Sequence, residues 1–174
     1  MGKQKRETTF SAHAVIEHPR GTGRFVLIEE TAPHKRGKFN IPGGNEDEED
    51  LSSLPRTAAR ETKEETGAGV NPIDPNHGLD VVINDLIAVY PHEKRPKHRI
   101  AIFSGFVASG IMRPTSEHPI VDAYSIEEID EFYRNDMLRH PRVHHAIHAY
   151  LGGLTVPINL LAPQQIRESA ITEL

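Results

Sequence analysis

Three carboxylates share one helical face in the segment Arg60-Glu61-Thr62-Lys63-Glu64-Glu65-Thr66-Gly67. At about 3.6 residues per turn, Glu61, Glu64 and Glu65 stand at positions i, i+3 and i+4 and project from the same side. Like charges at these spacings destabilise an isolated helix by a few tenths of a kcal/mol per pair. A multivalent cation would neutralise them. Oxygen-only ligands favour Mg²⁺ or Mn²⁺, which in turn favour phosphate-bearing substrates.

A Pro42-Gly43-Gly44 turn precedes these acids, which distinguishes them from an ordinary solvated charge run. Glycine has no Cβ, so the main chain of the turn can bring a carbonyl close to a cation. Arg60 lies at i−4 from Glu64, a spacing at which a side-chain pair can hold a ligand in its orientation. We therefore expect a divalent cation between the acidic face and the turn.

Gly44, a spacer and the run from Arg60 to Gly67 resemble the Nudix box. The family form is a glycine, five residues, a glutamate, seven residues, then Arg-Glu-apolar-any-Glu-Glu-any-Gly-apolar. The Arg-Glu-any-any-Glu-Glu-any-Gly half is intact. Thr62 replaces the usual apolar residue, and Ala68 is a small occupant of the last apolar position.

The first half of the box departs from the family spacing. Gly44 lies sixteen residues before Arg60, where the family has fourteen, so the chain looks as if it carries a two-residue insertion. The first glutamate of the box is therefore ambiguous among Glu48, Glu49 and Asp50. We favour Glu49.

The resemblance implies a metal site and a reaction. Glu64 and Glu65 would be metal ligands together with the Gly44 carbonyl, and Glu61 would be either a further ligand or the general base. Arg60 and Glu61 are the expected catalytic residues. The implied reaction is hydrolysis of a phosphoanhydride by water that Mg²⁺ or Mn²⁺ activates. The family often adds one more acid from a later loop, for which Glu93 and Glu117 are the candidates.

A basic loop just before the glycine turn is the expected phosphate contact. Within the segment His34–Lys38, Arg36 and Lys38 are the expected substrate partners, with ordinary surface charge as the alternative. The chain has no tryptophan, so Phe39 is an expected stacking residue for a base, although it could equally belong to the core. The basic segment 94–99 is a weaker candidate.

The order of the expected elements indicates an α+β fold. We expect strands near residues 10–18, 24–31, 38–41, 81–90, 100–108 and 120–124, and helices near 54–66, 126–132 and 141–151. The first helix should have Pro55 in its first turn and Ser52 or Ser53 as its cap, and Ser125 and Glu128 should form a capping box at the start of the second. The basic segment 92–99 is expected to be a wide hairpin loop. This order predicts a mixed β-sheet between helices, and the resemblance implies the same α/β/α sandwich. At 174 residues the chain is expected to be a single domain, 1–174, with a core at about 8–162 and flexible ends at 1–7 and 163–174.

Bulk composition excludes several classes of protein. A formal charge of −5 argues against general nucleic-acid binding, since no basic patch is concentrated enough to replace counterions on a duplex. No apolar run is long enough to span a bilayer, and the basic start has no apolar segment behind it. The absence of cysteine excludes disulfides and is compatible with a reducing cytoplasm, the expected location. The expected partner is a small phosphorylated substrate. Many relatives form homodimers, and the sequence leaves that state open.

Three histidines, His140, His144 and His148, recur at i, i+4 and i+8 near the C-terminus. This spacing would suit a zinc face. Because Val143 and Ile147 supply an apolar stripe on the same segment, we favour an amphipathic packing helix with the histidines on its solvent side.

The expected function is Mg²⁺-dependent hydrolysis of a nucleotide or another nucleoside diphosphate-linked compound. The segments 27–31 and 138–151 look similar to the small nucleotide phosphatase branch with broad specificity. The alternative is a catalytically silent Nudix-fold nucleotide sensor, which loss of the box acids would favour, yet Glu61, Glu64 and Glu65 are present. An isomerase-like reaction usually requires a cysteine.

Overall fold

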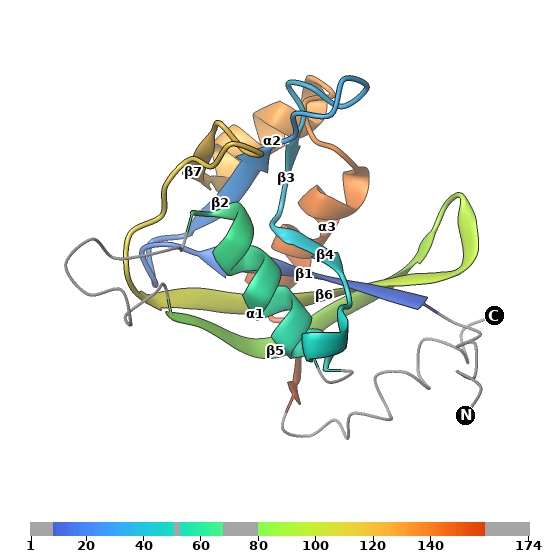
Figure 1. The fold of residues 1–174 in the computed structure, drawn as a ribbon. Coiled ribbons are helices and arrows are strands. Elements are labelled where there is room, and N and C mark those ends of the chain that lie inside the picture. The colour runs from blue at the N-terminus through green and yellow to red at the C-terminus, as the bar shows by residue number, and fades with distance from the viewer. Residues whose placement is uncertain (1–8, 51–52, 68–79, 159–174) are drawn as a thin grey trace, which may run out of the picture.

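The computed structural model describes residues 9–50, 53–67 and 80–158, and a mixed sheet forms its centre (Figure 1). The strands are β1 (Thr9–Glu17), β2 (Arg24–Glu29), β3 (Phe39–Asn40), β4 (Gly43–Asn45), β5 (Asp80–His92), β6 (Arg95–Ser109), β7 (Val121–Ser125) and β8 (Val156–Pro157). The helices are the short 3₁₀ turn η1 (Glu48–Asp50), α1 (Leu54–Glu65), α2 (Ile126–Arg134) and α3 (Pro141–Leu151). The expected ends at 1–7 and 163–174 lie outside the described residues.

The sheet has the order β3-β2-β1-β6-β5-β8, with β4 paired to β1 and β7 paired to β2. The long central pair β1 and β6 is parallel, and the other pairs are antiparallel. The mixed sheet predicted from the sequence is therefore confirmed.

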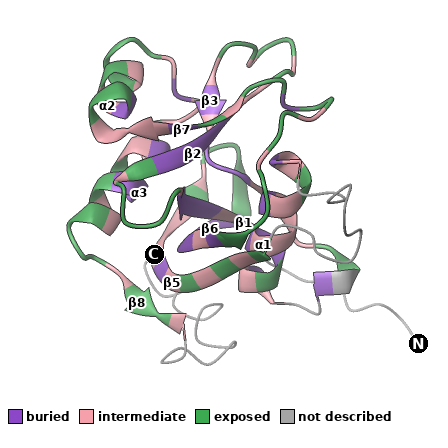
Figure 2. Cartoon of the chain, turned by 90° about the vertical axis from the view of Figure 1, so that its left-hand side faces the viewer, coloured by how far each residue is buried: buried purple, intermediate pink, exposed green. Residues whose placement is uncertain are grey.

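Two hydrophobic clusters lie on opposite faces of the sheet. Phe10, Ala12, Ala14 and Ile16 alternate along β1 and pack with Leu54 and Ala58 of α1. On the other side, Val15 of β1 packs with residues of α2 and α3, namely Ile129, Val143, Ala146 and Ile147. Figure 2 shows buried residues along β1, β2 and β6. This arrangement is the α/β/α sandwich that the sequence predicts, because strand side chains alternate between the two faces.

Helix α1 begins with Pro55 in its first turn, as expected. The residue before it, Ser53, occupies the N-cap position without a side-chain cap bond, so the expected serine cap is absent there. Thr62 is buried, and its hydroxyl donates to the Ala58 carbonyl at 2.7 Å. That bond explains how a threonine is accommodated at an apolar position, since its hydroxyl is not left unpaired.

The connection between β5 and β6 is a tight hairpin. The expectation of a wide basic loop at residues 92–99 is therefore wrong. The turn is Glu93 and Lys94, because β5 continues to His92 and β6 already begins at Arg95. The parallel register joins Thr9 to His98 and continues along both strands. Pairing with β1 satisfies the backbone hydrogen bonds of β6 from His98 onward, so the strand also includes polar residues before the apolar run at 100–108.

Helices α2 and α3 close the second face. The capping box predicted at the start of α2 is confirmed, since Ser125 and Glu128 each accept the other's backbone N–H. Helix α3 has the predicted bounds, whereas the short strand β8 is not anticipated by the sequence. Within the described ranges, every helix is too short or too polar to traverse a bilayer.

Candidate functional site

Glu65, in the last turn of α1, is bound to the glycine turn. Its Oε2 accepts a hydrogen bond from the Gly43 N–H at 2.7 Å, and its Oε1 lies 3.2 Å from His118 Nε2. His118 Nδ1 in turn lies 2.8 Å from the Glu29 carbonyl oxygen. Although burial opposes it, the bonds to Glu65 and Glu29 raise the pKa of His118. The carboxylate of Glu65 is thus fixed between α1, the turn and the loop before β7.

Arg60 is the centre of an ion-pair network. Its Nε and Nη2 each donate to Asp50 at 3.0 Å, and Nη2 also reaches the Asn45 carbonyl at 3.0 Å. It also lies 2.9 Å from Glu64 and 3.0 Å from Glu61. The guanidinium therefore connects the acidic face of α1 to β4 and η1.

Asp50 is the buried acid of this network, with a side chain only 3% exposed. Burial opposes ionisation, yet the hydrogen bonds from Arg60, the Asp47 N–H and the Thr57 hydroxyl outweigh it and lower the pKa of Asp50. The hydrogen bond to Asp50 is also the main reason why the pKa of Arg60 is raised above its ordinary value. The side chain of Glu49, the acid favoured from the sequence, lies outside the described residues.

Glu61 packs directly against the glycine turn. A Cβ at Gly44 would lie 2.5 Å from the Glu61 carboxylate, so only glycine leaves room for this contact. Burial raises the pKa of Glu61 to about 7, against the opposing charge of Arg60 and with a further contribution from Glu65. An uncompensated carboxylate is therefore costly at this position.

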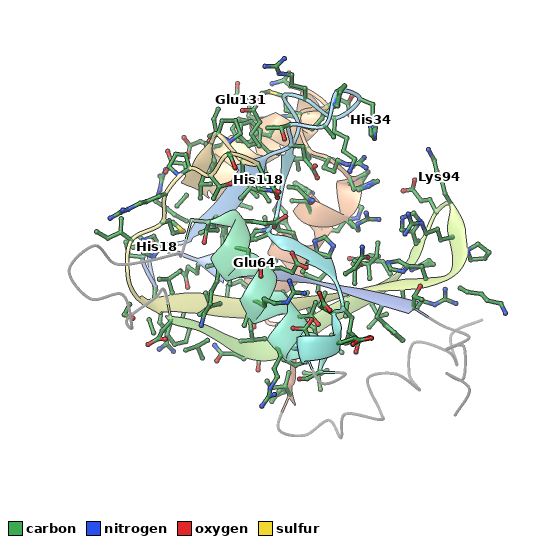
Figure 3. The ribbon with its side chains drawn as sticks, viewed as in Figure 1. His18, His34, Glu64, Lys94, His118 and Glu131 are labelled. Carbon is green, nitrogen blue, oxygen red and sulfur yellow. The ribbon has the colours of Figure 1, made fainter. Side chains whose placement is uncertain are left out.

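The three acids of the helical face differ in their surroundings. The side chains of Glu61 and Glu65 are 16% and 17% exposed, whereas that of Glu64 is 57% exposed. Figure 3 shows Glu64 on α1 below His118. The structure thus brings Glu61 and Glu65 to the turn and leaves Glu64 at the rim, paired with Arg60.

A cavity of about 280 Å³ opens beside Glu65 and the Gly43-Gly44 turn. Its cationic lining residues are Lys35, Arg95, Arg139 and Arg142, and its histidines are His13, His92, His98 and His140. Glu65 of α1 and the glycine turn therefore form one wall of the site, and the basic residues of β6, α3 and the loops form the other, with the acid Glu30 among them. A smaller cavity of about 160 Å³ adjoins it at the β5–β6 hairpin, where Lys94 marks the tip (Figure 3).

Three histidines of the cavity, His13, His98 and His140, have lowered pKa values and are neutral at pH 7. Burial is the main cause of a pKa of about 4 for both His13 and His140, and the nearby charge of Arg142 adds to it in each case. Burial likewise lowers the pKa of His98. At neutral pH the positive potential of the cavity consequently comes from its arginines and its lysine, and the imidazoles offer neutral hydrogen-bonding groups.

The NUDIX domain model matches residues 8–151. The chain belongs to the NUDIX family. Solved structures share the fold. One of them is a Nudix hydrolase from Nitrosomonas europaea, which is 24% identical to this chain. The match covers 89% of this chain and 96% of that chain, with a TM-score of 0.67. A search of the curated proteins finds no match to this chain.

Two further solved structures of similar fold bear substrate names. An Ap4A hydrolase complex from C. elegans has 16% identity, with 84% of this chain and 98% of that chain covered and a TM-score of 0.60. An ADP-ribose pyrophosphatase from Streptococcus suis has 21% identity, with 68% of this chain and 75% of that chain covered and a TM-score of 0.50. At these identities the likeness concerns the fold. As a member of the family, this chain is a Nudix hydrolase.

The substrate residues expected from the sequence lie away from the cavity of this Nudix fold. Phe39 is buried among Tyr124 and Phe132, because β3 directs it into the core. Lys38 pairs with Asp136 at 2.6 Å, and Arg36 is exposed and is not part of the cavity lining. The same basic loop reaches the cavity through a residue that the sequence did not single out, Lys35.

Several site residues carry no recognisable sequence signal. His118 is remote from the Nudix box, and Arg139 and Arg142 come from the start of α3, so only the tertiary fold brings them to Glu65. Of the two acids suggested as an additional base, Glu93 is at the hairpin tip, 3.6 Å from His140. Glu117 is exposed, and its carbonyl accepts from Thr31.

Proposed function

We propose that the chain hydrolyses a phosphoanhydride bond in a nucleotide or another nucleoside diphosphate-linked substrate, with Mg²⁺ or Mn²⁺ as cofactor. The observation that carries this proposal is the pairing of two walls in one cavity. Glu65 and the Gly43-Gly44 turn form one side, and Arg139 and Arg142 contribute to the other. Hydrolysis of a pyrophosphate requires both features. A metal cation neutralises the reacting phosphate, and fixed positive side chains bind the adjacent, non-reacting phosphate.

The donor set fits a hard divalent cation. Glu61, Glu64 and Glu65 offer carboxylate oxygens, and the Gly44 carbonyl would complete the set. The missing Cβ at Gly44 creates the space that the Glu61 carboxylate occupies against the turn. An oxygen-only site of this kind favours Mg²⁺ or Mn²⁺ over zinc. When bound, such a cation neutralises phosphate oxygens and lowers the pKa of a bound water.

The protein groups then have separate tasks. Glu61 is the proposed proton acceptor for the attacking water, held at the turn between Gly44 and Arg60. Arg60 is a positioning residue, since its contacts are to Asp50, Asn45 and the acids of α1. Its role is to keep the carboxylates in place through the reaction.

The basic wall is the proposed site for the non-reacting phosphate. Arg142 lies in the first turn of α3 and Arg139 just before that helix. The Glu30 carboxylate lies 3.7 Å from Arg139 Nε and 3.8 Å from Lys35 Nζ. Guanidinium groups bind phosphate oxygens with charge-assisted, often bidentate hydrogen bonds. The Ap4A hydrolase and ADP-ribose pyrophosphatase of the same fold support a substrate of this chemical class.

A nucleotide panel assayed with and without Mg²⁺ tests the proposal. We expect product release that requires the cation, and a loss of at least about 100-fold in kcat for Glu65→Gln because the carboxylate charge is removed. Glu131→Gln, on the exposed side of α2, is the matched control and should retain full activity. Turnover of Glu65→Gln within about tenfold of wild type, with unaltered Mg²⁺ dependence, contradicts the metal role. Nucleotide binding without any turnover favours the sensor alternative.

A further inference from the structure

Two imidazoles of α3 and one carboxylate of α2 meet at a point outside the cavity. His144 Nε2 and His148 Nε2 each lie 2.8 Å from Asp130 Oδ1. The two histidines stand at i and i+4, so they occupy the same side of α3. The three potential ligand atoms all lie within 4.8 Å of one another.

The third histidine of the sequence pattern is not part of this group. His140 lies at the cavity, where its Nδ1 is 3.6 Å from Glu93 Oε1. The side chain that completes the set comes from Asp130, fourteen positions before His144 in the chain. The group therefore contains two of the three histidines of the sequence pattern, and the packing of α2 against α3 adds Asp130.

The chemistry of the group differs from that of the acidic face on α1. Two imidazole nitrogens and one carboxylate oxygen are typical ligands of zinc, whereas Mg²⁺ prefers oxygen alone. With zinc bonds of about 2.0–2.2 Å, ligand atoms around one tetrahedral ion are about 3.3 Å apart. The two contacts between Asp130 and the histidines therefore need to open by about half an ångström.

The surroundings hold the ligand atoms in place. The Tyr133 ring stacks on His144 with centroids 4.2 Å apart and an interplanar angle of 14°. Asp130 Oδ1 lies between the two imidazole nitrogens, 2.8 Å from each, which places the carboxylate at the junction of α2 and α3. His148 is 44% exposed, which leaves the group accessible to an ion from solvent.

We propose that Asp130, His144 and His148 form a second metal site, which binds Zn²⁺ and is separate from the acidic face of α1. Three protein ligands leave at least one coordination position for water. Because the ligands come from two helices, the ion fastens α2 to α3. Bound zinc should therefore raise the melting temperature, by about 5 °C at saturating concentrations.

Calorimetric titration with ZnCl₂ tests this site in the full chain, after removal of metals with EDTA and dialysis into millimolar Mg²⁺. The magnesium occupies oxygen-only sites and leaves the imidazole site free for zinc. We expect one tight equivalent of Zn²⁺ for the wild type. The double variant His144→Gln/His148→Gln should lose at least about 100-fold in affinity, and Asp130→Asn about tenfold.

Two matched controls distinguish this group from the other histidines. His145→Gln removes an exposed neighbour that is outside the group and should bind zinc normally. His92→Gln/His98→Gln removes cavity histidines, which could bind zinc themselves, and should also keep the tight equivalent. Loss of the equivalent in the cavity variant and its retention in the α3 variant overturns the proposal.

Spectroscopy provides a second readout that does not depend on stability. Substitution with Co²⁺ should give visible absorption bands of four-coordinate geometry in the wild type and in His145→Gln. His148→Gln alone should lose these bands, and because this side chain is 44% exposed the variant should remain folded. If the wild type shows neither a heat of zinc binding nor cobalt absorption bands, the proposal is overturned. Asp130 then serves only to join the two helices by hydrogen bonds.

Discussion

Asp50 and Arg60 form a bidentate ion pair. The arginine Nε lies 3.0 Å from Oδ1 of Asp50, and Nη2 lies 3.0 Å from Oδ2. Because the remaining donors of Arg60 reach Glu64 and the Asn45 carbonyl, this pair orients the acidic face of α1 against β4. The acid comes from the part of the chain where the spacing of the Nudix box is two residues longer than usual. In the structure this part of the chain, the 3₁₀ turn η1, brings the Asp50 carboxylate to Arg60.

Asp50→Asn should destabilise the protein by about 3 kcal/mol, because the substitution leaves Arg60 without its buried partner. Urea denaturation monitored by circular dichroism measures the change. Asp136→Asn is the control, since that carboxylate is 92% exposed in its pair with Lys38 and such pairs contribute at most about 1 kcal/mol. Equal effects of the two substitutions would show that burial of the Arg60 pair is irrelevant to stability.

Gly44→Ala should reduce kcat at least about tenfold, because the added Cβ would lie 2.5 Å from the Glu61 carboxylate and displace it. The measurement is steady-state turnover at saturating Mg²⁺. Gly21→Ala is the control: an alanine would be strained at the φ of 78° that Gly21 adopts, but its Cβ would meet no neighbour within 4 Å. That variant should lose some stability and keep its turnover. An unchanged kcat for Gly44→Ala would exclude the close packing of Glu61 as a requirement for activity.

Arg142→Gln should raise KM at least about tenfold and change kcat less, since the cavity wall is proposed to bind the non-reacting phosphate. The effect should diminish at high salt, where screening weakens the lost interaction. Arg134→Gln, on the exposed end of α2, is the control and should leave KM unchanged. A loss confined to kcat would assign Arg142 to the chemical step instead.

Stability should fall as the pH drops from about 6.5 to about 4, in part because of His13. Its pKa is lowered from 6.5 to about 4 in the folded protein, mainly by burial. Between these values the unfolded chain binds a proton that the folded chain does not, so the contribution is complete above pH 6.5 and is lost on acidification. It amounts to at most about 3 kcal/mol.

Denaturant titrations at a series of pH values measure this contribution. His13→Gln should flatten the acid limb of the stability profile, because it removes the group whose protonation favours unfolding. His145→Gln, which removes an exposed imidazole, should leave the profile as it is in the wild type. An identical slope for His13→Gln and wild type refutes the assignment.

The elements with strong local patterns could be predicted from the sequence. Helix α1 is recognisable from the spacing of its acids and its Pro55 start, and α2 from the Ser125 capping box, because both signals operate over a few residues. The alternation of apolar residues in β1 likewise places the sheet core. The fold class follows from the order of these elements.

The basic half of the site could not be predicted in the same way. Arg36 and Lys38 are close to the glycine turn in sequence, yet Lys38 turns to Asp136, and the cavity is lined instead by Lys35 and Arg142. Which basic side chain faces the cavity depends on the tertiary packing of loops and helix ends. Asp50 was one of three candidate acids in the sequence, and its contact with Arg60 is a tertiary one that the sequence does not show.

The parallel pairing of β1 with β6 has a consequence for synthesis of the protein. The register joins Thr9 to His98, so one edge of β1 stays without its neighbour until the ribosome has released residues beyond 95. An apolar strand with an open edge is prone to pair with another chain. Contacts so distant in sequence also form slowly. Nascent chains of this Nudix hydrolase that stall within β5 are consequently the ones we expect to aggregate or to require a chaperone.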